Sequence, residues 1–343
     1  WMGKLTMKVH ITNLYGMGIQ SVAQIAQHMV AKIACQNLGY HELAIFNYRW
    51  NEEPLNARTA RYDGILSAVG NHDIVIFQSP SWNELGWDSG LMDRLAGYED
   101  VKKIVFVHDV IPLMFEVNRQ LMPQWVHYYN QADVLIVPST KMLQVLQQAG
   151  VNVKKVVIQQ MWDHLTTVDP LIQPGNRRVI NFAGNPQKFT FVREWNYPTV
   201  QLRLFAPAQA WPGQPNVRFM GWQDDSQLMT TLRQNGGFGL VWSTDPYWSK
   251  YMTLNASYKL STYLAAGIPV IINPQTPARQ LIEQNHLGIV ASSLDEAVQV
   301  VADFSDDRYQ AMQAAVERFA FLLRNGYFTR RVLTAAVFKA LTD

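Results

Sequence analysis

Cysteine is nearly absent from the sequence, because Cys35 is the only one in 343 residues. A single thiol excludes an intramolecular disulfide and any metal site built from several cysteines, and it fits a reducing compartment. Long hydrophobic runs are missing too, since no eighteen consecutive apolar residues occur and no charged and then apolar leader precedes Met7. We therefore expect a cytoplasmic chain without stable membrane insertion, with Met7 as its natural start and residues 1–6 foreign to the fold.

Charge of one sign is also scarce, because 29 Lys and Arg are matched by 27 Asp and Glu, leaving a net charge of +2. Without a large field of one sign the chain is a poor match for nucleic acid, so small molecules or neutral chains are the expected partners. No Asp-x-Asp triplet occurs, and the eight histidines show no paired ligand spacing. We therefore predict a site that uses neither a metal ion nor a resident cofactor.

Aromatic residues, by contrast, are plentiful. The sequence contains 11 Trp, 14 Tyr and 15 Phe, many of them in segments that otherwise look polar. Ring faces in loops suit the stacking of sugars or bases, although rings more commonly fill cores and interfaces. The length and a hydrophobic content of 48% exceed what one compact core needs, and they suit two α/β domains of ordinary size.

Short apolar runs rich in β-branched residues recur along the chain, with amphipathic stretches of helical length between most of them. In the first half these runs cover 8–14, 42–48, 73–78, 103–109, 133–139 and 155–160. In the second half they cover 178–185, 200–207, 217–222, 237–243, 268–274 and 287–292. Alternating strands and helices, with strands that are nearly continuously apolar, are typical of doubly wound parallel sheets.

The alternation breaks over 161–177, where Asp169-Pro170 and Pro174-Gly175 interrupt the apolar period. We therefore predict a Rossmann-like domain over 7–160, a hinge over 161–177 and a second Rossmann-like domain over 178–325. A last helix, over 326–343, is expected to cross back to the first domain. Two such domains have a natural site in the cleft where the carboxyl ends of both sheets face each other.

The first strand runs into a glycine-containing turn, Gly16-Met17-Gly18, and a helix is expected from Ile19. Glycines between a strand and a helix let backbone N–H groups turn toward a ligand. The dinucleotide fingerprint is incomplete, since its third glycine position holds Ser21. Two interpretations stay open: a loop that faces the substrate, and a turn that simply needs glycine.

Two further strand ends of the first half carry polar groups. His108-Asp109 ends the run 103–109, and either side chain could take a proton from a sugar hydroxyl, although a structural loop contact is nearly as well supported. The loop after the run 73–78 offers Gln78, Ser79 and Trp82, whose amide, hydroxyl and indole suit sugar binding.

In the second half, Gly184-Asn185 closes a strand and Lys188 follows, while Asn255 opens a helix that carries Lys259 in its first turns. Two lysines near glycine turns or helix ends suit a diphosphate that no metal neutralises, because the transition state places charge on the leaving group. Each lysine alone would more often be a solvated surface charge. Trp222, Ser243, Thr244 and Tyr258 are counted with them as substrate-binding residues, and the aromatic loop 243–251 is either a mobile lid or an interface patch.

These residues carry a resemblance to a known family. The segments that carry it are MKVHITNLYGMGIQSVAQIAQ, the His108-Asp109 pair, FAGN with its following cation, GFGLVWS and NASYKLSTYLAAGIPVI. From Met7 to about Leu341 the chain resembles GT-B glycosyltransferases that add the second sugar to O-GlcNAc on serine-rich-repeat adhesins of lactobacilli and streptococci. Galactofuranosyltransferases share the GLVW and Asn-x-x-x-Lys-x-Ser-x-Tyr-Leu part.

The resemblance implies a GT-B fold, a UDP-glucose or UDP-GlcNAc donor, a GlcNAc-modified Ser/Thr-rich protein acceptor and a homo-oligomer, dimer or tetramer. It also implies that Lys188 and Lys259 hold the donor phosphates, with Asn255 and Ser261 nearby. By the same similarity, Gly16, Met17 and Gln20 line the cleft from the first domain. One departure stands out, because Leu254 and Thr262 occupy the places where many retaining GT-B enzymes carry two glutamates.

Three functions therefore enter the comparison with the structure. The leading one is a metal-independent hexosyltransferase. The second is a catalytically silent GT-B subunit that binds glycosylated adhesin and stabilises a partner enzyme, although the retained lysines argue against it. The third is a UDP-sugar epimerase, which would need acid and base residues in place of an acceptor site.

Overall fold

The computed structural model describes residues 7–18, 20–169, 171–207 and 213–342. Within these residues the chain divides into two compact α/β units. The first unit runs to Gln159 and takes up the chain again at Phe328, and the second unit covers Gln160–Tyr327. Three elements of the sequence prediction lie outside the described residues: the segment 1–6, the helix start at Ile19 and the hinge residue Pro170.

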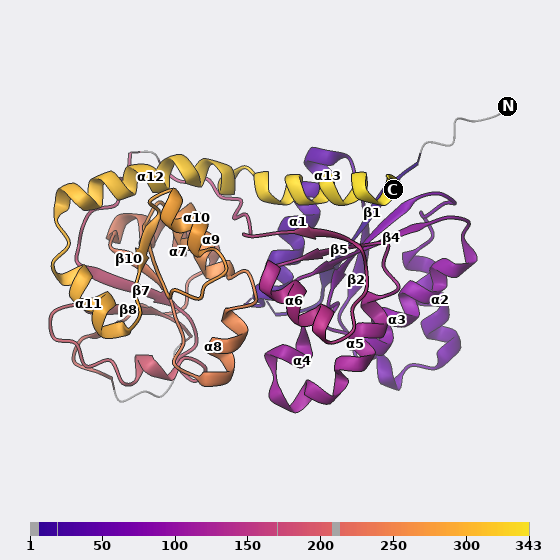
Figure 1. The fold of residues 1–343 in the computed structure, drawn as a ribbon, viewed down its shortest axis with the longest axis horizontal. Coiled ribbons are helices and arrows are strands. Elements are labelled where there is room, and N and C mark those ends of the chain that lie inside the picture. The colour runs from indigo at the N-terminus through magenta and orange to yellow at the C-terminus, as the bar shows by residue number, and fades with distance from the viewer. Residues whose placement is uncertain (1–6, 19, 170, 208–212, 343) are drawn as a thin grey trace. The chain divides into compact units, whose positions relative to one another are not determined.

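As far as it is described, the first unit forms a parallel six-stranded sheet with the order β2-β1-β3-β4-β5-β6 (Figure 1). Each predicted strand of this half is present. The strands are β1 Val9–Tyr15, β2 His41–Phe46, β3 Ile74–Ser79, β4 Lys102–Val107, β5 Val134–Val137 and β6 Lys155–Ile158. Every residue of β3 and of β5 is buried, as expected of central strands covered on both faces.

Helices connect these strands. The first helix, α1 Val22–Leu38, begins where the Ser21 side chain accepts a hydrogen bond from Gln24 N, and it ends at Gly39 in the left-handed conformation. The predicted helix after β5 is α6 Thr140–Gln148, capped by Ser139. The remaining helices are α2 Leu55–Ile65, α3 Leu85–Asp93, α4 Ile111–Met114 and α5 Met122–Tyr129, with short 3-10 turns η1 Trp50–Glu52, η2 Arg94–Gly97 and η3 Glu116–Leu121.

The C-terminal helix α13, Tyr327–Leu341, belongs to the first unit from Phe328 onward (Figure 1). Its buried side chains include Val332, Leu333 and Ala336. Polar contacts fix it to the edge strand β6, because the Arg331 guanidinium donates to the carbonyls of Ile158 and Gln159 at 3.1 and 2.9 Å. The first unit is therefore built from two separate parts of the chain.

Over its described residues the second unit repeats the architecture, with a parallel six-stranded sheet in the order β12-β11-β10-β7-β8-β9. Each predicted strand is again present, somewhat shorter than predicted. The strands are β7 Val179–Ala183, β8 Gln201–Phe205, β9 Val217–Phe219, β10 Phe238–Val241, β11 Val270–Ile272 and β12 Gly288–Val290.

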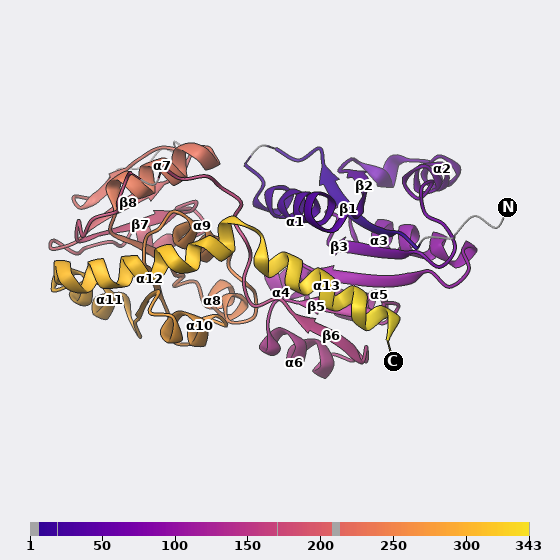
Figure 2. The ribbon, with the colours of Figure 1, turned by 90° about the horizontal axis from the view of Figure 1, so that it is seen from above.

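Helices cover this sheet, and α7, α9 and α10 lie side by side along one face, where α12 crosses α9 (Figure 2). The other face is packed by aromatic residues of the β7–β8 connection and by α11. The bounds are η4 Thr190–Val192, α7 Asp225–Asn235, α8 Pro246–Met252, α9 Tyr258–Ala265, α10 Arg279–Gln284, α11 Leu294–Ala302 and α12 Asp306–Arg324.

Part of the predicted hinge is firmly packed into the second unit. Met161, Trp162, Asp163 and His164 are all buried. The indole of Trp162 donates to Ala256 O at 2.9 Å, and the Trp162 carbonyl accepts a 2.6 Å hydrogen bond from the Ser261 hydroxyl. The segment 161–164 therefore forms part of the support of α9.

No helix among the described residues is both long and apolar enough to cross a membrane.

Candidate functional site

Two lysines meet among aromatic rings at the carboxyl edge of the second sheet. The Lys188 ammonium lies 3.3 Å from the centre of the Trp248 ring and 5.8 Å from that of Phe189. The Lys259 ammonium lies 4.7 Å from the centre of Phe189 and 6.0 Å from that of Phe182. The negative faces of the rings favour the ammonium groups. Two like charges therefore lie close together at this edge. We call these five residues the lysine pair and its aromatic cage.

Local sequence explains the cage. Gly184 follows β7, and a Cβ atom there would lie 2.8 Å from the Phe182 ring and 3.1 Å from the Phe189 ring, so glycine is required where the rings pack. The next residues form a turn in which the backbone N–H groups of Lys188 and Phe189 both donate to Asn185 O at 3.0 Å. This turn places Lys188 beside Phe189 and gives Gly184 and Asn185 a structural role next to the predicted ligand contact.

The third ring comes from a short helix. The sequence predicts a loop over 243–251, which is wrong, because Pro246–Met252 forms α8. Asp245 caps this helix by accepting a 2.7 Å hydrogen bond from Trp248 N, and proline occupies its first turn. The cap fixes the turn that carries Trp248 and so sets the position of the ring beside Lys188.

The electrostatic state of Lys259 follows from its surroundings. Burial, reinforced by the positive charge of Lys188, lowers the pKa of Lys259 to about 8. The fold therefore holds a cation at a place that disfavours it. An anion bound between the two ammonium groups would relieve that cost, which is the chemistry that a diphosphate needs.

Other predicted residues of this unit fall into two groups. Asn255, just before α9, carries a buried Oδ1 that accepts no hydrogen bond among the described residues, so it can serve a ligand. Ser261 is fully buried and its hydroxyl donates to Trp162 O, so the structure gives it a role inside the protein in place of the predicted ligand contact.

The four remaining predicted residues of this unit differ in their surroundings. Trp222 is 40% exposed and Thr244 is exposed, whereas Ser243 is buried and accepts a hydrogen bond from Asp245 N. Tyr258 stacks on His164 with ring centres 5.3 Å apart, and burial raises its pKa well above the usual range. Tyr258 thus stays neutral and packs the start of α9.

In the first unit, the glycine turn after β1 is held by α1. Met17 N donates to the side chain of Gln24 at 2.8 Å, and the Ser21 hydroxyl contacts the Met17 sulfur. Gly16 has a φ of 83°, which favours glycine. Gly16 and Gln20 are exposed and Met17 is half-buried, so all three remain open to a ligand.

Two residues predicted to bind substrate lie inside the first unit. The Gln78 amide donates to Thr12 O at 2.6 Å and Gln27 O at 3.1 Å, which joins β3 to β1 and α1. Ser79 is fully buried, and its carbonyl accepts a 2.8 Å hydrogen bond from His108 N. The amide nitrogen of Gln78 is thus used within the fold and Ser79 is inaccessible, whereas Trp82 keeps part of its surface exposed.

The two residues of the predicted His108-Asp109 pair differ in burial. His108 is buried against Phe106, and burial lowers its pKa to about 3, so at neutral pH the ring is uncharged and is a weak base. Asp109 is half-buried and follows at the strand's carboxyl end. Of the pair, Asp109 is the better candidate for a proton acceptor.

A buried carboxyl that the sequence analysis did not identify lies beneath the loop 79–84. Asp88 of α3 accepts hydrogen bonds from Ser81 N at 3.1 Å and from the Ser81 hydroxyl. Burial raises the pKa of Asp88 to about 7. A sequence signal exists, because Asp88 lies on the helical stripe of Leu91, Met92 and Leu95, which are all buried.

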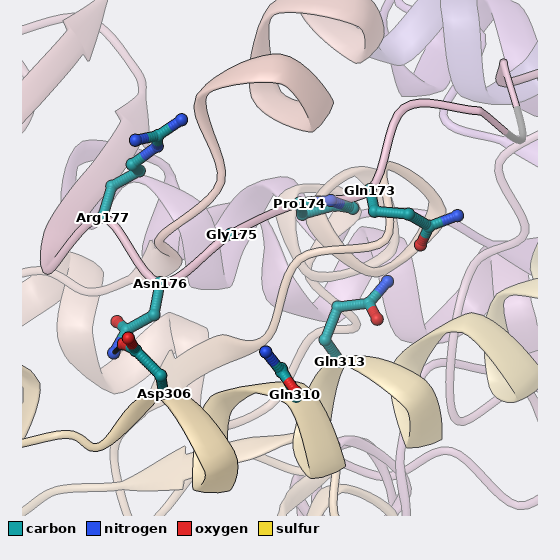
Figure 3. Close-up of a pocket in the computed structure, with 8 residues that line it drawn as sticks. All are labelled: Gln173, Pro174, Gly175, Asn176, Arg177, Asp306, Gln310 and Gln313. Atoms are coloured by element: carbon teal, nitrogen blue, oxygen red, sulfur yellow. Dashed lines mark hydrogen bonds between the residues drawn. The ribbon is translucent and has the colours of Figure 1, made fainter.

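A polar groove of about 570 Å³ lies at the amino edge of the second sheet, away from the lysine pair (Figure 3). Gln310 and Gln313 extend from α12 toward the segment before β7, while Arg177 points away. Asn176 closes one end by donating to Phe304 O and the Asp306 carboxylate. The groove is lined by Gln173, Pro174, Gly175, Asn176, Arg177, Asp306, Gln310 and Gln313.

In the described part of the chain, no three His, Cys, Asp or Glu side chains gather as a metal site.

Comparison with protein families places this geometry in context. Residues 8–161 match the family model described as glucosyltransferase 3-like, N-terminal domain, and residues 180–336 match the corresponding C-terminal domain. The chain belongs to the glucosyltransferase 3-like family. The glucosyltransferases 3 of Streptococcus parasanguinis and Streptococcus gordonii are each 42% identical to this chain, over 98% of it and 100% of their own length.

Solved structures show the same fold at low identity. HepE from Anabaena, in complex with UDP-glucose, is 14% identical with a TM-score of 0.64, over 97% of this chain and 100% of its own. Sucrose-phosphate synthase from Thermosynechococcus elongatus is 11% identical with a TM-score of 0.68, over 98% and 100%. The predicted GT-B fold class and the predicted family are therefore confirmed, and with them the coarse function of a glycosyltransferase.

We expect replacement of Lys259 by Met to stabilise the protein. Because the folded pKa of about 8 lies below the usual 10.5, the charged form costs stability below pH 8, and the cost disappears as the pH rises toward 10.5. Since Lys259 keeps some exposed surface, we expect a gain of about 1–2 kcal/mol at pH 7. Denaturant unfolding measures it, with Lys250→Met, an exposed lysine of α8, as control. An unchanged or lower stability of Lys259→Met would contradict the buried charge.

Asp88→Asn tests the buried carboxyl. A folded pKa of about 7, above the usual 3.8, means that the parent loses stability as the pH rises from about 4 to about 7. The Asp88→Asn variant lacks this titrating carboxyl. The difference between the unfolding free energies of parent and variant should therefore change by about 2–4 kcal/mol over that window. Unfolding at a series of pH values gives the difference, and Asp93→Asn, exposed on the same helix, should follow the parent. Parallel curves for Asp88→Asn would mean that Asp88 titrates normally.

Proposed function

We propose that the chain transfers a hexose, glucose or GlcNAc, from a UDP-sugar to O-linked GlcNAc on a serine-rich-repeat adhesin. The lysine pair and its aromatic cage carry the donor part of this proposal, because two ammonium groups converge there with a buried amide oxygen of Asn255 nearby in the chain. The name of the streptococcal relatives and the UDP-glucose complex of HepE favour glucose. The acceptor follows from the family resemblance, as does a homo-oligomer.

In the proposed reaction, a hydroxyl oxygen of the acceptor sugar forms a bond to the anomeric carbon of the donor. The bond between that carbon and the β-phosphate oxygen breaks, and UDP leaves with the negative charge. Lys188 and Lys259 stabilise this charge as it develops. The hydroxyl proton must go to a base, and Asp109 is the carboxylate that we assign to this step.

We further propose that the transfer needs no divalent metal. Two ammonium groups supply the positive charge that a magnesium ion would otherwise bring to a diphosphate. The depressed pKa of Lys259 supports this role, since the site is built to gain a negative partner. A silent binding subunit would have no reason to keep a destabilising buried cation.

The function can be tested with a GlcNAc-modified Ser/Thr peptide and a panel of UDP-sugars, weighing the product by mass spectrometry. We expect one added hexose, undiminished by a chelator. Lys259→Met should lower kcat/KM by about 100-fold or more, because it removes charge from the leaving-group site, whereas Lys250→Met should retain activity. Absence of product with every donor would favour the silent subunit, and an epimerised donor without acceptor would favour the epimerase.

Binding of UDP should be coupled to proton uptake. The diphosphate favours charged Lys259, so its pKa of about 8 in the free protein should rise in the complex. Near pH 8, about half a proton should be taken up by Lys259 per UDP, and the affinity should fall as the pH rises above 8. Calorimetry in buffers of different ionisation enthalpy measures the uptake. Binding without any uptake in parent protein, or equal uptake in Lys259→Met, would exclude Lys259 from the phosphate site.

A further inference from the structure

An aromatic side chain at the carboxyl end of β2 is largely exposed to solvent. Phe46 is 60% exposed, although it ends a strand of a well-packed sheet. Its neighbour in the sheet is β1, and the register pairs Phe46 with Tyr15, the residue before Gly16. The ring therefore lies at the same edge as the glycine turn.

The Phe46 ring packs against Gly16. A Cβ atom at residue 16 would lie 2.7 to 2.9 Å from three atoms at the far end of the Phe46 ring, closer than real Cβ contacts. The φ of 83° at Gly16 disfavours larger side chains for a second reason. The backbone thus comes directly against part of the ring, which restricts the ring while most of its surface faces outward.

Two asparagines fix the loop that carries Phe46. Asn83 donates to Phe46 O at 3.0 Å, and Asn47 donates to Trp82 O at 2.7 Å. Asn83 also accepts a hydrogen bond from Tyr48 N at 3.0 Å. Because β2 and β3 lie on either side of β1, this reciprocal pair ties together the two loops that flank Gly16.

The second of these loops presents another ring. Trp82 keeps part of its surface exposed and has a φ of 61°, a conformation that is costly for a bulky residue. Its indole Nε1 is buried and, among the described residues, has no hydrogen-bond partner. Asp88 holds the loop from below through Ser81. The fold thus uses several polar contacts to hold two partly exposed rings at one edge.

The residues around the rings indicate which ligand they suit. The segments 15–18, 46–48 and 79–84 contain no lysine or arginine, and Glu84 is their one charged residue. Arg61, whose guanidinium lies 4.4 Å from the centre of the Tyr48 ring, is paired with Glu53, so these segments offer a phosphate-bearing nucleotide little positive charge. A neutral sugar fits, because the C–H face of a pyranose packs on an aromatic ring and amides can bind its hydroxyl groups.

We propose that Phe46 is the stacking face for the acceptor sugar, fixed by Gly16 and by the Asn47–Asn83 pair, with Trp82 beside it. This inference rests on the proposed function, since it assigns the acceptor of that transfer to the carboxyl edge of the first sheet. It makes Phe46 a residue that determines acceptor binding and leaves donor binding to the lysine pair.

The test compares Phe46→Ala, Phe46→Leu and Phe46→Tyr. The probe is a GlcNAc-modified Ser/Thr peptide, and the unmodified peptide serves as its reference. We expect Phe46→Ala and Phe46→Leu to weaken binding of the modified peptide about tenfold and to raise its KM by the same factor, because leucine lacks a ring face. Phe46→Tyr should bind as the parent does. The Kd for UDP should be unchanged in every variant.

Phe338→Ala is the matched control, because Phe338 is 67% exposed on α13. Equal affinity of parent and Phe46→Ala for the modified peptide would overturn the inference, as would a parent that does not distinguish it from the unmodified peptide. A changed assembly mass in Phe46→Ala, measured by sedimentation, would also overturn it by making the ring a contact between copies. Binding is measured directly, so a parent that binds the glycopeptide but transfers nothing contradicts the proposed function and leaves this assignment standing.

Discussion

The approach of two like charges is the constraint that shapes the carboxyl edge of the second sheet, where the exposed Lys188 meets the half-buried Lys259. The fold brings Lys188 and Lys259 together beside the faces of Trp248 and Phe189. A ring face favours a cation without adding an opposite charge, so the rings leave the positive potential of the ammonium groups in place. Local structure supports this arrangement. Gly184 leaves room for the rings, and the Asp245 cap of α8 fixes the position of Trp248.

Much of the fold could be predicted because parallel strands are distinct in sequence. All twelve predicted strands are present, since apolar runs such as 74–77 are bounded by polar segments. Helices of the first unit were harder to locate: α2 is mostly exposed, and Gly86 and Gly90 lower the helical propensity of α3. The segment 243–251 was predicted as a loop because it contains proline and several aromatic residues. It instead holds most of a seven-residue helix that one capping aspartate stabilises.

The site could be predicted only as far as residue type and strand end allow. The lysines were found because each follows a turn or opens a helix. Their cage was not, because Trp248 and Lys259 are far in sequence from Lys188 and Phe189, and only packing brings them together. For Gln78, Ser79 and Ser261 the residue type suited a ligand, but all three are buried, and the Gln78 amide and the Ser261 hydroxyl donate to backbone carbonyls inside the protein.

The return of α13 to the first unit has a consequence for how the protein forms. Because Phe328 and the residues after it complete a unit whose first part ends at Gln159, that unit can bury its whole core only when both parts of the chain are present. The second unit is made from one continuous stretch. A fragment cut at Gln159 would therefore expose the apolar surface that Val332, Leu333 and Ala336 normally cover.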